Sequence, residues 1–427
     1  MTKLTKDNLF VLVKSLTKSE KRQFKLYVGR LGVNEDSKFL LLFKLLERLK
    51  AYDEKLILKQ GFVKKQQLSN LKAHLYKQIL ISLKLNPSHQ NLRIQLREQL
   101  DFATILYHKG LYKQSLKILD KAKALAIKNQ EKNIAYEIVE LEKVIESQYI
   151  TRSLSNRADA LTIQAKELSR QNVIASKLSN LSLQLYGLFL KTGYVKNNAE
   201  HEKVTDYFDK RMPKFKIEAL GFREKLWLYK SHLWYSFLIQ DFKSCYKYSR
   251  KWVDLFYDNE TMIPLNPVFF LRGYQYLLEA LFFIKHHQKF KNVLNDFEQI
   301  TQKAWFPHDD NIDGLVFLCL YSNKINLHFM EGSFTEGLPL TEEVLEGLKR
   351  HANQIDEHHV MVFYYKIASL YFGTADYENA ICFLSKIINN KSLQMREDLL
   401  CFSRILNLVA HYEACLLYTS PSPRDRG

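Results

Sequence analysis

Apolar residues recur along this chain at the spacing of helix faces, and residues 363–390 show the pattern most clearly. In that stretch, small and large apolar residues follow one another mostly at intervals of three or four positions. They are Ala368, Tyr371, Ala375, Tyr377, Ala380, Leu384 and Ile387. The spacing predicts two antiparallel helices joined by a short turn at 374–377, which together form a helical hairpin.

The same order of residues occurs a second time, 265 positions earlier in the sequence. The earlier copy consists of Ala103, Leu106, Gly110, Tyr112, Ser115, Leu119 and Ala122. One hairpin buries little apolar surface by itself, and chains that repeat hairpins stack them. The repeat therefore predicts a continuous stack of helical hairpins.

Turns between the helices of further hairpins can be placed from Gln90 onward. Each falls at a glycine or a small or polar residue, which suits the left-handed geometry of a helix C-terminus or a tight reversal. Their average period is about 44 residues, which gives about seven hairpins. The predicted turns lie at Gly110, near Ser153, at Gly193, near Asp241, near Gln288, at Gly332 and at Ala375.

The first 86 residues predict a separate helical module. Its second helix opens with Thr17-Lys18-Ser19-Glu20, a capping-box sequence in which Thr17 and Glu20 satisfy each other's backbone N–H groups. Pro87 stops the last helix, because proline disfavours helix at the residue before it. We place the domain boundary there, with the hairpins over 90–414. The predicted helices of the module cover 5–16, 18–31, 36–51, 53–60 and 64–85.

The composition supports an all-α fold. Eight prolines and fourteen glycines are few for 427 residues, and Val, Ile and Thr do not cluster in the alternating runs that strands show. The abundant Leu, Lys, Glu, Gln and Ala lose little side-chain freedom in a helix. The sequence thus predicts an all-α chain in which stacked hairpins follow an N-terminal helical module.

The two matching units resemble the tetratricopeptide repeat. The resemblance implies helix-turn-helix units that stack into a right-handed α-solenoid and serve protein recognition. Two segments of the N-terminal module, SLTKSEKRQFKLY and LKAHLYKQILISLKL, are also similar to uncharacterised helical proteins of Bacteroidota, which implies no activity. The repeat-defining positions are Ala103, Gly110, Tyr112, Ala122, Ala368, Tyr371, Tyr377 and Ala380.

The last residues differ abruptly from the apolar helix before them. Cys415 to Asp425 read CLLYTSPSPRD, a string that resembles the in-frame translation of a transposase sequencing adapter. We therefore expect 415–427 to be a non-native tail. On this interpretation the natural sequence runs to about Ala414 and is cut in mid-helix, and we expect the natural protein to be longer.

The net charge of +17 is concentrated in the N-terminal quarter. Residues 1–100 carry 21 Lys and Arg against 8 Asp and Glu, while the other 327 residues carry 42 against 38. A concentrated positive field attracts phosphates and releases counterions. Nucleic-acid binding, an acidic protein partner and solubility alone all stay open for this region. Its candidate basic stripe on the second helix consists of Lys18, Lys21, Arg22 and Lys25.

A second candidate surface lies between Trp227 and Tyr257, where eleven residues are aromatic. One interpretation is a groove that takes an acidic peptide or a nucleic-acid strand, with cations on carboxylate or phosphate and rings available to stack. The other is an aromatic seam beneath a solvated charged face, because rings at helical spacing usually form core. The cations that share one helix face here are Lys243, Lys247, Arg250 and Lys251.

Metal sites and catalytic motifs are not indicated. Residues 309–314 match the first half of an EF-hand loop, but Leu320 occupies the position that needs a bidentate Glu, so we expect a loop with Asp313 as helix N-cap. The histidines lack HExxH spacing, and the five cysteines form no CxxC pair. No Walker loop, GxGxxG or GxSxG is present. We therefore expect no metal, no cofactor and no enzymatic activity.

These observations predict a cytoplasmic, non-enzymatic scaffold that binds a protein or peptide through the concave groove of its repeats. In one interpretation that partner is acidic. The alternative is a regulator in which the basic N-terminal module binds nucleic acid and the repeats sense a ligand. No membrane association is expected, because the N-terminus is charged throughout and no apolar run approaches the roughly 18 residues that a bilayer requires.

Overall fold

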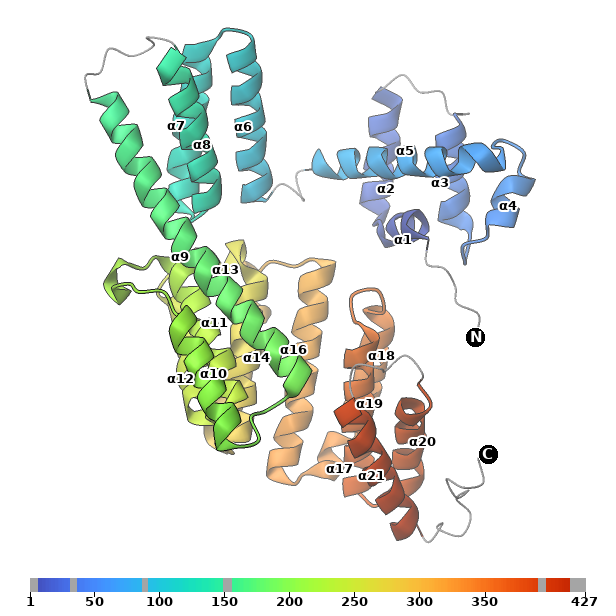
Figure 1. The fold of residues 1–427 in the computed structure, drawn as a ribbon. Coiled ribbons are helices and arrows are strands. Elements are labelled where there is room, and N and C mark those ends of the chain that lie inside the picture. Colours follow the sequence, from blue (N-terminus) through green and yellow to red (C-terminus); the bar gives the residue numbers. More distant parts are fainter. Residues whose placement is uncertain (1–6, 31–36, 87–90, 149–155, 391–396, 415–427) are drawn as a thin grey trace. The chain divides into compact units, whose positions relative to one another are not determined.

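The computed structural model describes residues 7–30, 37–86, 91–148, 156–390 and 397–414 (Figure 1). Within those ranges all regular secondary structure is helical, which confirms the all-α prediction. Internal contacts divide the chain into two compact units, residues 1–122 and 123–427. The predicted tail at 415–427 lies outside the described residues, and so does most of the predicted boundary at 86–90. None of the described helices combines the length and the apolar character needed to cross a membrane.

The first five helices share one apolar core. Its most deeply buried side chains include Val28, Phe43 and Leu75, each fully shielded from solvent. The observed bounds differ from the predicted ones by at most three residues at either end, because amphipathic spacing determines them. These helices are α1 (Asn8–Ser15), α2 (Lys18–Arg30), α3 (Lys38–Arg48), α4 (Glu54–Lys59) and α5 (Lys65–Lys84).

The capping box at the start of α2 is confirmed. The backbone N–H of Glu20 donates to Thr17 Oγ1 at 3.2 Å, and the backbone N–H of Thr17 donates to Glu20 Oε2 at 2.7 Å. The two hydrogen bonds satisfy N–H groups at the start of α2, where the helix itself supplies no acceptor. The sequence pattern therefore specified this helix start correctly.

The repeated hairpin is confirmed in its local structure. It comprises α6 (Leu92–His108) with α7 (Tyr112–Lys128), and α19 (Glu357–Gly373) with α20 (Tyr377–Ile388). The helices α19 and α20 begin 265 residues after α6 and α7, which is the offset read from the sequence. Gly110 and Ala375 occupy equivalent turn positions with φ of +74° and +62°.

Side chains at the repeat-defining positions behave alike in both copies. Ala103, Ala122, Ala368 and Ala380 are buried. Tyr112, Tyr371 and Tyr377 are half-buried. Tyr112 packs against Tyr107 with ring centroids 6.0 Å apart, and Tyr377 packs against Phe372 at 5.5 Å, again at equivalent positions.

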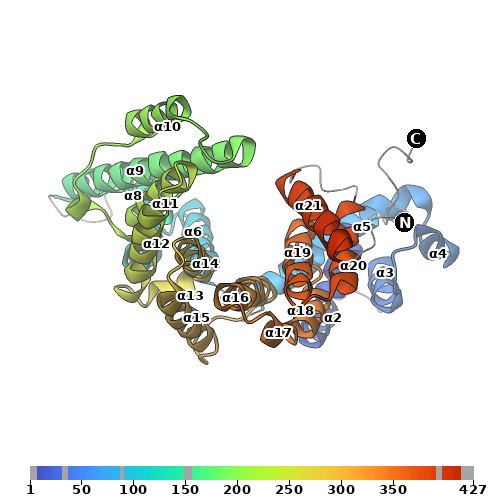
Figure 2. The ribbon, with the colours of Figure 1, turned by 90° about the horizontal axis from the view of Figure 1, so that it is seen from below.

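In the second unit, helices follow one another along the chain and each packs against its neighbours (Figure 2). Its central core contains Trp252, Phe256 and Phe270, all fully buried. The helices are α8 (Lys132–Gln148), α9 (Arg157–Thr192), α10 (Asn198–Arg211), α11 (Phe222–Leu238), α12 (Phe242–Tyr257), α13 (Met262–Leu265), α14 (Pro267–Phe283), α15 (His287–Thr301), α16 (Asp310–Glu331), α17 (Phe334–Gly337), α18 (Leu340–Arg350), α19, α20 and α21 (Glu397–Glu413), with a short 3-10 turn, η2 (Ile217–Ala219).

Most predicted turns coincide with residues in the left-handed region. Gly193 and Gly332 have φ of +70° and +69°, while Gln240 and Lys285 occupy the turns expected near Asp241 and Gln288. A further left-handed residue, Gln130, ends the turn between α7 and α8 and was not predicted. The turn near Ser153 lies outside the described residues. Between that turn and Gly193 the chain forms the single 36-residue helix α9, which belongs to two of the predicted hairpins at once.

The predicted N-cap of α16 was wrong by one helical turn. Asp309, not Asp313, caps this helix, since Asp309 Oδ1 accepts from the backbone N–H of Ile312 at 2.8 Å. Starting the helix at Asp310 buries Ile312, whereas a start after Asp313 would leave that side chain in a loop. Asp313 instead pairs with His308 at 2.8 Å.

Candidate binding groove

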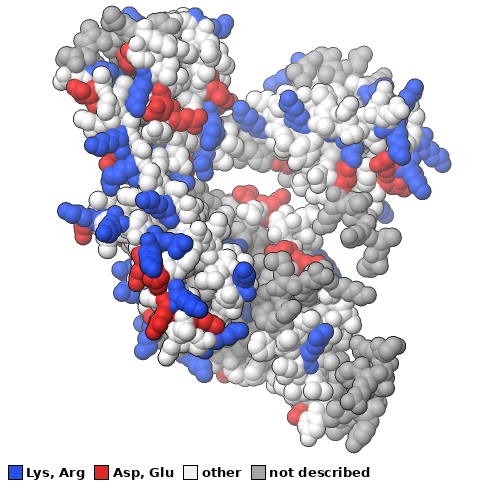
Figure 3. All heavy atoms as spheres, in the orientation of Figure 1, with Lys and Arg blue, Asp and Glu red and all other residues white. Residues whose placement is uncertain are grey.

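The basic stripe predicted on α2 lies at the surface of the first unit. Lys18, Arg22 and Lys25 are exposed and Lys21 is half-buried, while Phe24 beneath them is buried. Lys25 forms an ion pair with Glu47 at 3.1 Å. Figure 3 shows Lys and Arg side chains over the visible face of α1–α5, with a few acidic ones near its lower rim.

The four cations predicted on α12 are exposed together on that helix. They are Lys243, Lys247, Arg250 and Lys251. Arg250 pairs with Asp254 at 2.9 Å. On the same helix Trp252 and Phe256 are fully buried, so these two rings belong to the core and offer no stacking surface.

A stack of rings lies beside two of these cations. His232 of α11 stacks on Tyr248 of α12, with ring centroids 4.3 Å apart and planes 7° apart, and contacts Phe208 of α10. Burial, with the nearby charges of Lys247 and Lys251, lowers the pKa of His232 to about 4. The imidazole therefore stays neutral well below its usual range.

A groove lies elsewhere in the second unit, along α9, α11, α14, α16 and the start of α19. Two adjoining hollows form it, of about 940 Å³ and about 360 Å³. They share Arg272, Gln275 and Glu279 of α14 and His358 and His359 of α19. None of the α12 cations lines either hollow.

One wall of the larger hollow is apolar and exposed. Leu183, Tyr186 and Leu190 follow one another on α9 at i, i+3 and i+7, and they are 68%, 38% and 54% exposed. Trp227 and Trp234 of α11 and Tyr276 of α14 line the same hollow. Exposed apolar side chains that line a hollow together mark a binding surface more often than single ones do.

Two cations line the same hollow as this apolar wall. Lys230 of α11 lies with its ammonium 4.9 Å from the ring centroid of Trp227 and 5.8 Å from that of Phe269. Arg272 of α14 donates a hydrogen bond to Gln275. Burial, together with the neighbouring charge of Arg272, lowers the pKa of Lys230. The two like charges thus share a partly dehydrated site.

The smaller hollow is more polar. Lys366 of α19 donates to the backbone oxygen of Ser322 at 3.2 Å and to Asn326 Oδ1, both on α16. Burial lowers the pKa of Lys366 to about 8, although the charge of Glu279 acts in the opposite direction. Asn323 completes a polar surface on α16 and donates to the backbone oxygen of Cys319 at 2.7 Å.

The acidic and imidazole groups at the α19 end are already engaged. Asp356 caps α19 by accepting from the backbone N–H of His359 at 3.0 Å and pairs with its ring nitrogen at 2.6 Å. These hydrogen bonds outweigh burial and lower the pKa of Asp356. Glu357 accepts from Asn390 at 2.7 Å. Among the described residues, no group of three His, Cys, Asp or Glu side chains is placed to hold a metal ion.

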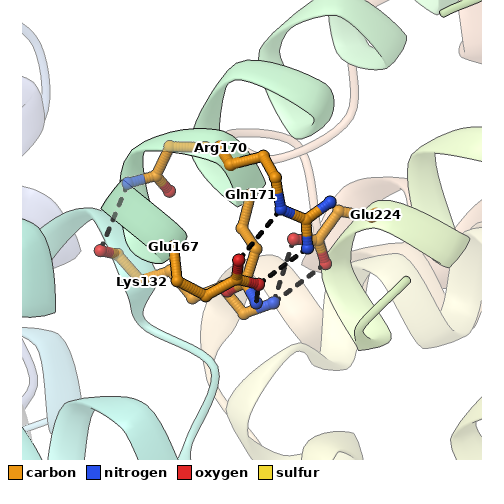
Figure 4. Close-up of polar contacts among 6 residues, drawn as sticks. Lys132, Glu167, Arg170, Gln171 and Glu224 are labelled. Atoms are coloured by element: carbon orange, nitrogen blue, oxygen red, sulfur yellow. Dashed lines mark hydrogen bonds and ion pairs between the residues drawn. The ribbon is translucent and has the colours of Figure 1, made fainter. Parts of the chain in front are cut away.

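A buried ion pair joins α8 to α11, one of the helices that line the groove. Lys132 of α8 donates to both carboxylate oxygens of Glu224 on α11, at 2.9 and 3.1 Å. Beside it, Arg170 and Gln171 of α9 donate to Glu167 (Figure 4). The side chain of Asn172 donates to the backbone oxygen of Lys132 at 3.3 Å. These contacts join α9 to α8 and α8 to α11, so they fix the helices that carry Leu183 and Lys230.

Comparisons of the chain with models of protein families, with curated proteins and with solved structures found no match.

Reasoning from the sequence missed the residues of the groove. Leu183, Tyr186 and Leu190 have the spacing of core positions, and only their exposure distinguishes them. Lys230 and Arg272 lie on different helices, and no local motif links them. The one available signal was Lys230 within the aromatic stretch that begins at Trp227.

Proposed function

We propose that this chain is a non-enzymatic scaffold that binds a protein or peptide through the groove along α9, α11, α14, α16 and α19. In this proposal the helices of the second unit form a tetratricopeptide-like solenoid, and the groove is its concave face. The observation that carries the proposal is the exposed apolar wall of the larger hollow, formed by Leu183, Tyr186 and Leu190. Leaving three such side chains in water costs free energy that a bound partner would recover.

Further support comes from the polar surface of the same groove. Gln275, Asn323 and Asn326 line the smaller hollow, where Asn326 donates to Asn323 at 3.3 Å and Gln275 accepts from Arg272. Amides have more than one site for hydrogen bonding, and a peptide backbone offers N–H and C=O groups in alternation. A groove of this kind would hold a segment of chain along several helices at once.

The test is a selection of displayed random peptides on the full chain. Selected peptides are then measured for binding to the wild type and to Leu183→Ser/Leu190→Ser, with Lys243→Gln/Lys247→Gln as the matched surface control. We expect the groove variant to weaken binding by about tenfold or more, since burying two leucines under the bound peptide contributes at least about 1.4 kcal/mol. Selected peptides that bind the groove variant as tightly as the wild type would contradict the proposal.

A second candidate function is nucleic-acid binding by α1–α5. It is favoured by the exposure of Lys18, Arg22 and Lys25 on one helix. The test is binding of the full chain to duplex DNA and single-stranded RNA over a salt series, compared with Lys18→Gln/Arg22→Gln. Phosphate binding predicts a steep loss of affinity with salt and a shallower slope in the variant. Equal slopes for both proteins would exclude this face.

A further inference from the structure

The larger hollow combines an apolar wall with two cations, and this combination indicates the class of peptide that it takes. We propose that it binds an acidic amphipathic helix. The apolar side chains of that helix would pack on Leu183, Tyr186 and Leu190, and one of its carboxylates would contact Lys230 and Arg272. The inference rests on the proposed function and specifies its ligand.

The two cations of the larger hollow, Lys230 and Arg272, have no anionic partner in an ion pair among the described residues. The only hydrogen bond between them and another described residue joins Arg272 to Gln275. Two like charges in a half-buried site repel each other, and burial together with the charge of Arg272 lowers the pKa of Lys230. An anionic group between them would remove that repulsion and gain charge-assisted hydrogen bonds.

Among the described residues, the acids that line the same hollow form no ion pair with these two cations. Asp356 is held by the N-terminus of α19 and by His359, and Glu357 accepts from Asn390. Glu279 of α14 lines both hollows, and its charge acts on Lys366 and on Tyr276. Lys230 and Arg272 are therefore the cations of the larger hollow that a carboxylate of a ligand could still pair with.

The indole of Trp234 adds a donor on the same side. Its Nε1 is buried and has no hydrogen-bond partner among the described residues. Ser182, next to Leu183 and fully buried, likewise has an unpaired hydroxyl. Buried polar groups without partners are uncommon in native proteins. Both residues line the larger hollow, although the two polar atoms themselves are shielded from solvent.

The apolar wall sets the shape of the ligand. From Leu183 to Leu190 the rise along α9 is about 10.5 Å, which equals two turns of a helix. An amphipathic helix laid along this wall presents its own side chains at i, i+3, i+4 and i+7, so its apolar face would match the stripe. Its flank would then face α11 and α14, where an acidic residue meets Lys230 and Arg272.

The experiment uses three short fluorescent peptides that share a helical leucine stripe and carry Glu, Gln or Lys on one flank. Each is titrated with the full chain, with Lys230→Gln, with Arg272→Gln and with the control Lys243→Gln. We expect the Glu peptide to bind the wild type about tenfold more tightly than the Gln peptide, because charge-assisted hydrogen bonds are stronger than neutral ones. The Lys peptide should bind most weakly. Either groove variant should reduce the Glu preference, and Lys243→Gln should retain it.

Two results would overturn the inference. One is equal binding of the Glu and Gln peptides, or a Glu preference that survives both groove variants. The other is no binding by any of the peptides. If peptides from the display selection still depend on Leu183 and Leu190, the groove remains a peptide site and only its acidic preference is wrong. Unchanged circular dichroism and melting temperature of each variant show that folding is not the cause.

Discussion

Lys132 and Glu224 form a buried ion pair across 92 residues of sequence, with the lysine side chain 9% and the glutamate side chain 1% exposed. The pair joins the start of α8 to the first turn of α11. Each group lies where an unpaired charge would be costly. The pair therefore makes the placement of α11, which carries Trp227, Lys230 and Trp234, dependent on a residue of a distant helix.

Lys132→Met should destabilise the protein by about 3–5 kcal/mol, because it leaves the Glu224 carboxylate buried without its cation. The double variant Lys132→Met/Glu224→Leu should recover much of that loss, since no charge is left unpaired. Urea unfolding followed by circular dichroism measures both. The matched control is the exposed pair of Lys210 and Asp206, 71% and 60% exposed, whose removal should change stability by less than about 1 kcal/mol. A double variant as unstable as the single one would contradict this account.

Gly347 allows α18 to approach α16. A Cβ atom at this position would lie 2.0 Å from Cε2 of Phe317, a ring that also packs against Phe363 with centroids 5.7 Å apart. Gly347→Ala should therefore destabilise the protein by about 1–3 kcal/mol through overpacking. Gly29→Ala is the control, because Gly29 is also helical but has nothing within 4 Å of its Cβ position, and it should stabilise by about 0.5–1 kcal/mol. Thermal unfolding of the two variants measures both effects. An unchanged melting temperature in Gly347→Ala would show that Phe317 can move away.

Gly110 and Ala375 occupy equivalent turns, so replacing the glycine by alanine and the alanine by glycine should change stability in opposite directions. Both have a left-handed backbone, which costs an L-residue with a Cβ about 1–2 kcal/mol. Ala375→Gly should therefore stabilise the protein, by less than this amount because glycine also gains freedom in the unfolded chain. Gly110→Ala should destabilise it. Chemical denaturation of both variants tests the prediction, and two shifts of the same sign would show that the turns are not equivalent.

Features that depend on neighbouring residues could be predicted from the sequence. Periodicity and capping rules act within a few turns of chain, and they correctly predicted the left-handed turn at Gly110 and the capping box of Thr17 and Glu20. Each hairpin is a local pattern of the same kind, so its second copy could be recognised 265 residues away. The prediction of Asp313 as the N-cap of α16 was wrong, because the start of this helix after Asp309 depends on burying Ile312 against other helices.

The groove could not be predicted because its residues meet only after the helices pack. Leu183 and Leu190 have a core-like spacing, and nothing in the sequence shows that this face of α9 stays exposed. Lys230 and Arg272 lie on different helices, and they line the same hollow only in the folded chain. The predicted cations on α12, such as Lys243, lie at helical spacing and are exposed, but they do not line the groove.

His232 should make stability depend on pH between about 4 and its ordinary pKa of about 6.5. Its folded pKa is lowered, so in this window the unfolded chain binds more protons than the folded one, and stability is lost as pH falls. His232→Phe keeps a ring to stack on Tyr248 and should remove this contribution. The difference in unfolding free energy between wild type and variant, measured across the window, should therefore favour the variant increasingly toward pH 4.

The cause of the lowered pKa can be tested in the same protein. NMR titration of His232 should give a value near 4 in the wild type. Lys247→Gln and Lys251→Gln should each raise the pKa, since both ammonium groups oppose a charged imidazole. Lys243→Gln, on the same helix but not among the charges that act on His232, should leave it unchanged. A His232 that titrates at its ordinary value in the wild type would show that the ring stack with Tyr248 and Phe208 is open to water, and the stability difference should then disappear as well.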